Sequence, residues 1–293
     1  MTGFADRLVE TTRQLGPLCV GIDPHAGRIP DLFGGDTPAG IAAWGIAMVE
    51  QARGRVAVVK PQVALFERHG PEGMAALQAV ATRARDAGLL IIMDAKRGDI
   101  GSTAEGYAAA YLDTNSPFPC DCLTVNPYMG LDTLEPYLER AEANGKGIAV
   151  LTRTSNPGSA DFEALKADDL PVWGHVAKAL APASERLMGE TGWSSLMLVA
   201  GATGPDEART LRQLARKSLF LVPGYGAQGA SVGEALSSFN QGPSGLEGGV
   251  VSASRSVSFP PAANTATRYA DWQTAIATAI DAAQAELKAA TQA

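Results

Sequence analysis

The sequence contains little cysteine and little histidine, with three residues of each among 293. Cys19, Cys120 and Cys122 are too few, and odd in number, for a disulfide framework, and they are typical of reduced thiols. The histidines are scattered, and no further Cys or His pair lies near Cys120 and Cys122, so the sequence predicts no metal site. We therefore expect a cytoplasmic protein without bound zinc.

Long apolar runs and an excess of positive charge are also missing. The run Leu89–Met93 is among the longest, well short of the ~20 residues of a membrane span. Charged residues such as Asp6 and Arg7 occupy the N-terminal segment, which lacks the apolar core of a signal peptide. The formal net charge of -7 argues against a general binder of nucleic acid or of anionic membranes. A small anionic ligand held by a local cluster of cations is compatible with this charge.

The sequence does contain a repeated alternation of short apolar runs with segments of helical period. Eight runs are almost continuously apolar, which is typical of strands buried on both faces of a parallel sheet. In chain order they are Leu18–Asp23, Val56–Pro61, Leu89–Lys96, Cys122–Asn126, Gly147–Thr152, Ser195–Ala200, Leu219–Pro223 and Gly249–Ser254.

Helices are predicted between these runs. Apolar residues from Leu131 to Ala141 recur at spacings of three and four, and Gly145 follows as a helix stop. Ser102 and Glu105 match the S-x-x-E capping box and predict the start of a helix after the third strand. A C-terminal helix docked on the sheet is predicted from an apolar stripe formed by Tyr269, Trp272, Ile276, Ile280, Ala283 and Leu287.

Eight strand–helix alternations over roughly 250 residues favour a (β/α)8 TIM barrel, with residues 1–293 forming one domain that ends in a helix. A doubly wound open sheet is the alternative. The segment Gly21–His25 after the first run carries no G-x-G-x-x-G motif, so the dinucleotide-binding form of that sheet has little support. The segment Asn240–Gly245 has the composition of a linker, but it lies between the seventh and eighth strands and is interpreted as a loop insertion.

The densest group of charged residues lies at the end of the third strand. In a barrel, active sites lie at this carboxyl-terminal end of the strands. Asp94 and Lys96 are two residues apart and point to the same side of a strand, while Asp99 lies on the turn into the next helix. Lys60 on the neighbouring strand can reach the same space, which gives an alternating row of charges that favour one another's ionised forms. A salt-bridge ladder at the barrel rim and a rigid cationic proton donor fit this spacing equally well.

A second group lies after the seventh and eighth strands. Pro223–Gly229 reads P-G-Y-G-A-Q-G, and Ser254-Arg255-Ser256 follows downstream. Glycines let backbone N–H groups approach an anion, and an arginine adds a bidentate partner. Barrels commonly bind phosphate at these two loops, so a phosphate site is favoured over a glycine-rich surface turn with a solvated arginine.

Together these motifs resemble the orotidine 5'-phosphate decarboxylases, and in particular their longer bacterial type 2 subgroup. The resemblance runs from about Gly21 to Ser256. It is carried by the D-x-K-x-x-D signature, the complete P-G-x-G-A-Q-G loop, Lys60, Asp23 and Thr152–Gly158. The G-R-S of many relatives reads S-R-S here, with Arg255 at its centre.

The resemblance implies loss of CO2 from orotidine 5'-monophosphate to give UMP, the last step of de novo pyrimidine nucleotide biosynthesis, without metal or organic cofactor. Lys96 would donate the proton to C6, and Asp94 would face the departing carboxylate. Lys60 would pair with Asp94 and hold a ribose hydroxyl. Asp99 would complete the charge row in the neighbouring subunit's site, so the resemblance implies a homodimer with shared sites.

The same resemblance implies contacts along the nucleotide. Asp23, and Thr103 from the neighbouring subunit, would hold ribose hydroxyls. Ser155 would read the pyrimidine edge, and Pro223 would pack near the base. At the other end, Gln228 would bridge the pyrimidine and the phosphate, and Arg255 would bind the 5'-phosphate.

Two other functions are compatible with parts of the pattern. One is a metal-dependent sugar-phosphate decarboxylase or aldol-type synthase of the same superfamily, since these share the D-x-K-x-x-D signature. The other is a phosphate- or nucleotide-binding barrel without enzymatic activity, in which the charge row is structural.

Overall fold

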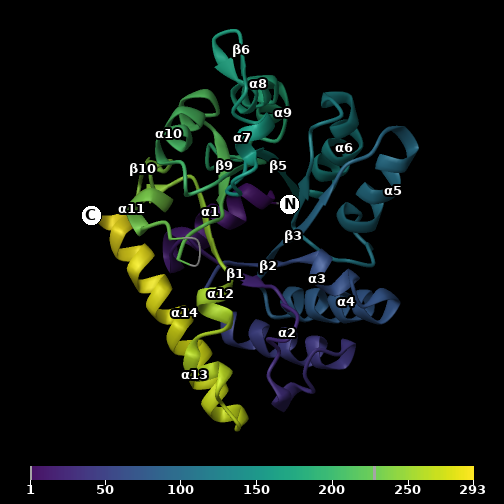
Figure 1. The fold of residues 1–293 in the computed structure, drawn as a ribbon. Helices are drawn as coiled ribbons and strands as arrows, with labels where there is room; N and C mark the ends of the chain where they lie inside the picture. Colours follow the sequence, from purple (N-terminus) through teal and green to yellow (C-terminus); the bar gives the residue numbers. More distant parts are fainter. Residues whose placement is uncertain (1, 227–228) are drawn as a thin grey trace.

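Eight parallel strands close into a barrel in a computed structural model that describes residues 2–226 and 229–293. Around the barrel the strand order is β1-β12-β9-β8-β5-β4-β3-β2 (Figure 1). The closed barrel confirms the predicted (β/α)8 fold and excludes the open doubly wound sheet. The strands are β1 (Leu18–Ile22), β2 (Val58–Pro61), β3 (Leu90–Arg97), β4 (Cys122–Val125), β5 (Gly147–Arg153), β8 (Ser194–Ala200), β9 (Ser218–Val222) and β12 (Gly249–Ala253).

Helices surround the barrel on the outside (Figure 1). No helix among residues 2–226 and 229–293 is long and apolar enough to span a membrane. The longer helices are α1 (Phe4–Leu15), α2 (Pro38–Ala52), α4 (Gly70–Asp86), α5 (Gly101–Leu112), α6 (Glu135–Asn144), α8 (Val172–Ala179), α10 (Pro205–Leu214) and α14 (Tyr269–Gln292). Shorter ones are α3 (Val63–Glu67), α7 (Ser159–Phe162), α9 (Ala181–Arg186), α11 (Val232–Ala235), α12 (Arg255–Ser258) and α13 (Pro261–Asn264).

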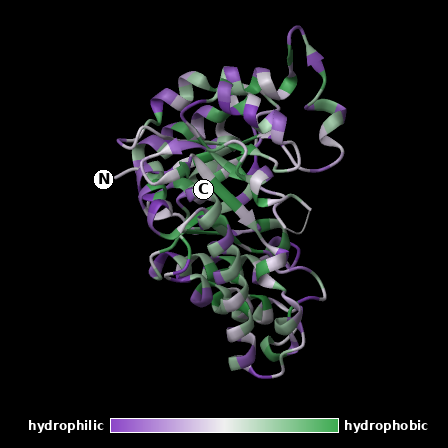
Figure 2. Ribbon diagram, turned by 90° about the vertical axis from the view of Figure 1, so that its left-hand side faces the viewer, coloured by the Kyte–Doolittle hydropathy of each residue, from purple (hydrophilic) through white to green (hydrophobic). Residues whose placement is uncertain are grey.

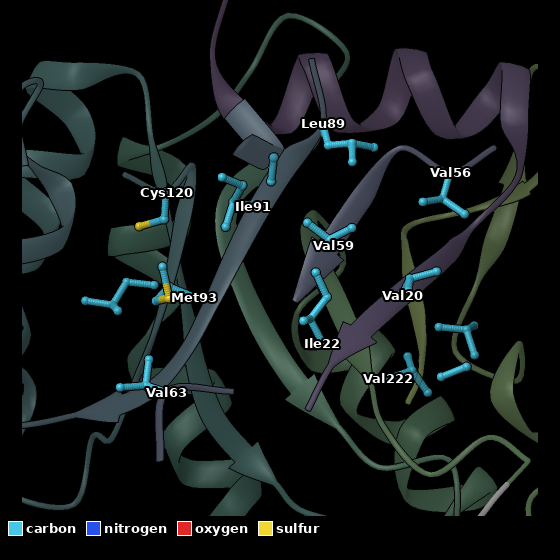
Figure 3. Close-up of a cluster of buried hydrophobic side chains, with 14 of the residues drawn as sticks. Val20, Ile22, Val56, Val59, Val63, Leu89, Ile91, Met93, Cys120 and Val222 are labelled. Carbon is cyan, nitrogen blue, oxygen red and sulfur yellow. The ribbon is translucent and has the colours of Figure 1, made fainter. Parts of the chain in front are cut away.

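The two faces of each strand face two different cores, which explains the almost continuous apolar runs. Outward side chains such as Val20, Val59 and Ile91 pack in the layer between strands and helices (Figure 3). Inward side chains such as Val58 and Ile92 fill the barrel, whose strands are mostly apolar in Figure 2. Every residue of β1, β2 and β12 is buried as a result.

The N-terminal helix α1 contributes to the core inside the barrel. Phe4, Ala5, Leu8 and Val9 are buried in the same cluster as the inward strand residues. A Cβ atom added to Gly147, at the start of β5, would lie 2.6 Å from the Phe4 ring. The helix therefore closes the end of the barrel at which the strands begin and leaves the opposite end for ligands.

One local prediction is wrong, and another is made more specific. Ser102 does not cap α5, because the chain already turns into the helix at Gly101, whose φ is 52°, and Ser102 lies inside the first turn. The segment Asn240–Gly245 is an insertion between the seventh and eighth barrel strands, as predicted, and the chain forms a hairpin there of β10 (Asn240–Gly242) and β11 (Gly245–Glu247). Its second strand is fixed by the Glu247 carboxylate, which accepts hydrogen bonds from Arg13 at 2.7 Å and from Trp193 at 2.9 Å.

Two other helix predictions, the end of α6 and the buried stripe of α14, are largely confirmed. Helix α6 ends at Gly145, which adopts a left-handed conformation with φ of 62°. In α14, Trp272, Ile276 and Ile280 are fully buried, whereas Tyr269 is 46% exposed. Helix α14 contacts α2 and α13 as well as β1, so it docks on the helical layer more than on the sheet itself.

We expect Phe4→Ala to lower the free energy of unfolding by about 3–5 kcal/mol, because it leaves a cavity in the core inside the barrel. Chemical denaturation of the purified protein measures this loss. Phe162→Ala is the matched control, since the Phe162 side chain is 70% exposed and its loss should cost less than about 0.5 kcal/mol. Equal effects of the two substitutions would contradict the role of α1 in closing the barrel.

Candidate active site

The carboxyl ends of the strands surround a cavity of about 600 Å³. Seven residues singled out in the sequence line it: Asp23, Lys60, Asp94, Lys96, Ser155, Pro223 and Arg255. A second hollow of about 580 Å³ lies beside Asp6 and Arg186, and none of the predicted site residues lines it. The residues to which the sequence assigns a chemical role therefore line the first cavity rather than the second.

A row of alternating charges lies at the base of this cavity. The two oxygens of Asp94 face two ammonium groups, with Oδ2 2.8 Å from Lys60 Nζ and Oδ1 2.5 Å from Lys96 Nζ. Asp23 Oδ1 lies 4.0 Å from Lys60 Nζ on the far side. Lys60 and Asp94 are buried, whereas the Lys96 side chain is 48% exposed. Lys96 is thus the cation of the row that a bound ligand can reach most easily.

Each buried member of the row holds its neighbour in the charged form. Burial alone would raise the pKa of Asp94, but the ammonium groups of Lys60 and Lys96 outweigh it and hold that pKa well below its usual value. Burial would lower the pKa of Lys60, but the carboxylates of Asp94 and Asp23 raise it above the ordinary value. Asp94 therefore stays an anion and Lys60 a cation at neutral pH.

The backbone of β3 departs from regular strand geometry where it carries Lys96. The pairing of β3 with β4 shifts register between Met93 and Arg97, and Lys96 adopts a φ of 49°, which is uncommon outside glycine. The Thr124 hydroxyl on β4 accepts hydrogen bonds from the N–H groups of Ala95 at 2.9 Å and Lys96 at 2.8 Å. Asp94 and Lys96 meet as the sequence predicts, but through this bulge rather than through a regular strand.

Two of the predicted residues are not brought to the row. Asp99 and Thr103 do not line the cavity, and the Asp99 carboxylate accepts a hydrogen bond from the Ile100 N–H at 2.8 Å. Thr103 is exposed on α5. Gln228 lies outside the residues that the structure describes.

The two loops assigned to phosphate do meet. Pro223, Gly224 and Arg255 line the same cavity. A Cβ atom added to Gly226 would lie 3.3 Å from the Ser256 hydroxyl, so the loops after β9 and β12 are in contact. The cavity therefore has a cationic, glycine-rich side opposite the row of charges on β2 and β3.

Some lining residues were not predicted. Gln62 donates a hydrogen bond from Nε2 to Asp94 Oδ2 at 3.0 Å, and its position two residues after Lys60 could have revealed it. Glu163 lines the cavity and accepts hydrogen bonds from the N–H and hydroxyl of Thr154, each at 2.8 Å. No periodic pattern in the sequence points to Glu163, because it belongs to an irregular loop.

The donor set does not favour a metal ion. Asp23 and Asp94 face the same space, but the Lys60 ammonium lies between them. Within the described ranges, no group of three or more His, Cys, Asp or Glu side chains is placed to hold a metal. The cysteines are buried instead, and burial raises the pKa of the Cys19 and Cys120 thiols to about 12.

Thr124→Val should destabilise the protein by about 1–3 kcal/mol, because the two N–H groups of Ala95 and Lys96 lose their acceptor. Thr124→Ser keeps the hydroxyl and is the matched control. Denaturation curves of both variants measure the difference. If the valine variant were as stable as the serine variant, the hydroxyl would not be what holds the bulge.

Comparison with known proteins shows which family this chain is similar to. The family model described as "Orotidine 5'-phosphate decarboxylase / HUMPS family" matches residues 16–251. An orotidine 5'-phosphate decarboxylase of Nocardioides sp. is 41% identical over 234 residues, 80% of this chain and 85% of the relative. One from Rhodopirellula baltica is 35% identical and covers 98% of this chain and 100% of the relative.

A solved structure agrees over the whole chain. The crystal structure of a candidate orotidine 5'-phosphate decarboxylase from Streptomyces avermitilis superposes with a TM-score of 0.85 and 37% identity. It covers 100% of this chain and 97% of the other. The matched residues include the strands that carry the charge row and the loop after β9. This chain belongs to the orotidine 5'-phosphate decarboxylase / HUMPS family.

Proposed function

We propose that this protein decarboxylates orotidine 5'-monophosphate to UMP and CO2, the last step of de novo pyrimidine nucleotide biosynthesis. The observation that carries the proposal is the row Lys60–Asp94–Lys96 at the base of a cavity whose other side is the phosphate-type loop pair. Relatives that carry this activity in their names align with nearly the whole chain. The charge row and the loop pair fit the two anionic ends of one nucleotide.

The chemical difficulty is the electron pair left on C6 when the C6–carboxyl bond breaks. In the proposed mechanism the Lys96 ammonium lies beside C6 and stabilises this pair electrostatically. The proton on Lys96 Nζ then moves to C6, CO2 departs, and the neutral amine takes a new proton from solvent. Asp94 cannot be the proton source, because its pKa is held below the usual value and it carries no proton at neutral pH.

Other residues bind and orient the nucleotide in this proposal. Asp23 Oδ1 is buried without a hydrogen-bond partner, which suits it to accept a hydrogen bond from a ribose hydroxyl. Ser155 reads the pyrimidine edge and Pro223 packs near the base. Arg255 binds the 5'-phosphate, and Gln228 bridges phosphate and base. Binding energy at the phosphate, far from C6, offsets the cost of ordering the reacting end.

The proposed active unit is a homodimer in which Asp99 and Thr103 serve the partner's site. Both residues lie outside the cavity of their own chain. Large apolar side chains are exposed around them, a surface that a second copy would bury. These side chains are Ile100, Tyr107, Tyr128, Met129 and Leu131.

A spectrophotometric assay with orotidine 5'-monophosphate tests the proposed function. We expect the wild-type protein to turn over the nucleotide in the presence of a metal chelator, with UMP as product. No turnover would contradict the proposal. Turnover of the nucleotide that disappears with chelator would contradict the metal-independent mechanism.

Lys96→Ala should reduce turnover by at least about 10³-fold, because it removes both the fixed cation and the proton donor. Binding of UMP, measured by calorimetry, should be largely retained. Lys178→Ala, which removes an exposed lysine on α8, is the control for loss of charge alone. Near-normal turnover in the Lys96 variant would refute the assigned proton donor.

Mixing Asp99→Asn with Lys96→Ala should restore activity that neither variant has alone. Random exchange makes half of the dimers mixed, and each mixed dimer has one intact site, so about a quarter of wild-type activity is expected. Subunit exchange is verified by native mass spectrometry. Confirmed exchange without recovery would contradict the shared site.

A further inference from the structure

One hydrogen bond links the loop after β9 to the C-terminal helix. The Tyr225 hydroxyl donates to Glu286 Oε2 at 2.6 Å, across 61 residues of sequence. Tyr225 lies among the residues lining the cavity, next to Pro223 and Gly224, and its ring belongs to the core between strands and helices. Glu286 lies on α14, the long yellow helix along one side of the barrel in Figure 1.

The Tyr225 end of this bond is buried, whereas Glu286 is exposed on α14. Tyr225 is only 9% exposed, and a tyrosine hydroxyl in such a position requires a hydrogen-bond partner. Burial raises the pKa of Tyr225, and the bond to Glu286 raises it further, so the hydroxyl keeps its proton and donates to the carboxylate. A hydrogen bond to a charged acceptor is short and stronger than one between neutral groups.

The backbone on both sides of Tyr225 adopts conformations that favour glycine. Gly224 has a φ of 108° and Gly226 a φ of 71°, both in the region that favours glycine. A loop with glycines at both sides of one residue has little intrinsic preference for a single conformation. The Tyr225 side chain therefore anchors this part of the loop, through its ring in the core and through its hydrogen bond to a carboxylate on α14.

Helix α14 is a firm support for such an anchor. Trp272, Ile276, Ile280 and Leu287 are fully buried along it. The Gln284 side chain accepts a hydrogen bond from the Leu18 N–H at 3.1 Å, which ties the helix to β1. Glu286 lies two residues after that tie and one residue before Leu287, so its backbone is held by the barrel itself.

We propose that Glu286 is a positioning residue for the phosphate end of the substrate. It holds Tyr225, and through Tyr225 it holds the root of the loop after β9 in the conformation that receives a 5'-phosphate. The inference rests on the proposed function, and it gives the C-terminal helix a part in substrate binding although no residue of α14 lines the cavity.

The test compares two substrates, orotidine 5'-monophosphate and phosphate-free orotidine. Glu286→Ala should lower kcat/KM for the nucleotide about three- to tenfold, mainly through KM. It should leave kcat/KM for orotidine within about twofold of wild type, because that substrate has no phosphate for the loop to receive. Glu286→Gln keeps an acceptor oxygen and should recover most of the loss.

Two further variants separate positioning from general stability. Tyr225→Phe keeps the ring and removes the hydroxyl, and its loss on the nucleotide should not add to that of Glu286→Ala in the double variant. Asp281→Ala on the same helix removes a surface ion pair with Arg55, 2.9 Å long, and should leave kinetics on both substrates unchanged.

Four outcomes overturn the proposal. Unchanged kcat/KM for the nucleotide in Glu286→Ala excludes a positioning role, and an equal loss on both substrates assigns Glu286 to general stability. Full additivity of the Tyr225 and Glu286 substitutions excludes a role through their hydrogen bond. Wild-type protein inactive on the nucleotide in the same assay refutes the proposed function and this inference with it, whereas an active wild type with unaffected variants refutes the inference alone.

Discussion

The structure depends on one buried carboxylate held between two ammonium groups. Asp94 lies on β3, Lys60 comes from β2, and Lys96 follows Asp94 by two residues. Removing a carboxylate and an ammonium from water is costly, and close pairing with further hydrogen bonds is what offsets that cost. Gln62 and the bulge held by Thr124 supply those bonds and that geometry. The row therefore produces a fixed electrostatic field at the base of the cavity, and this field is present before any ligand binds.

The barrel explains why this field can act on a ligand. Parallel strands bring all their carboxyl ends to one face, so residues from β2, β3, β4, β5, β8, β9 and β12, and Asp23 just after β1, line one cavity. Helix α1 contributes Phe4 and Leu8 to the core inside the barrel and closes the opposite face. The cavity thus lies at the carboxyl ends of the strands, and the core that α1 closes lies toward their other ends. The helical layer connects the two through contacts such as that of Glu286 with Tyr225.

The barrel could be predicted from the sequence because a strand that is buried on both faces has an almost unbroken run of apolar residues. The sequence also predicted Lys60, Asp94 and Lys96 as neighbours, because adjacent strands of known polarity fix where their ends lie. It could not predict the bulge at Lys96, which depends on a hydroxyl from β4, nor the hairpin β10–β11, which depends on contacts of Glu247 with two distant elements. Contacts such as Glu163 with Thr154 depend on loop conformation and leave no periodic pattern.

The ionisation of Asp94 is the most direct measure of whether the row is a fixed electrostatic field. Carbon-13 NMR of the side-chain carboxyl groups can follow it in the ligand-free protein, with Asp94→Asn used to assign the resonance. The structure predicts that Asp94 stays ionised as pH falls through the ordinary aspartate pKa of about 4. Protonation of Asp94 at or above that pH would show that Lys60 and Lys96 do not hold its charge, and would contradict the electrostatic basis of the proposed catalysis.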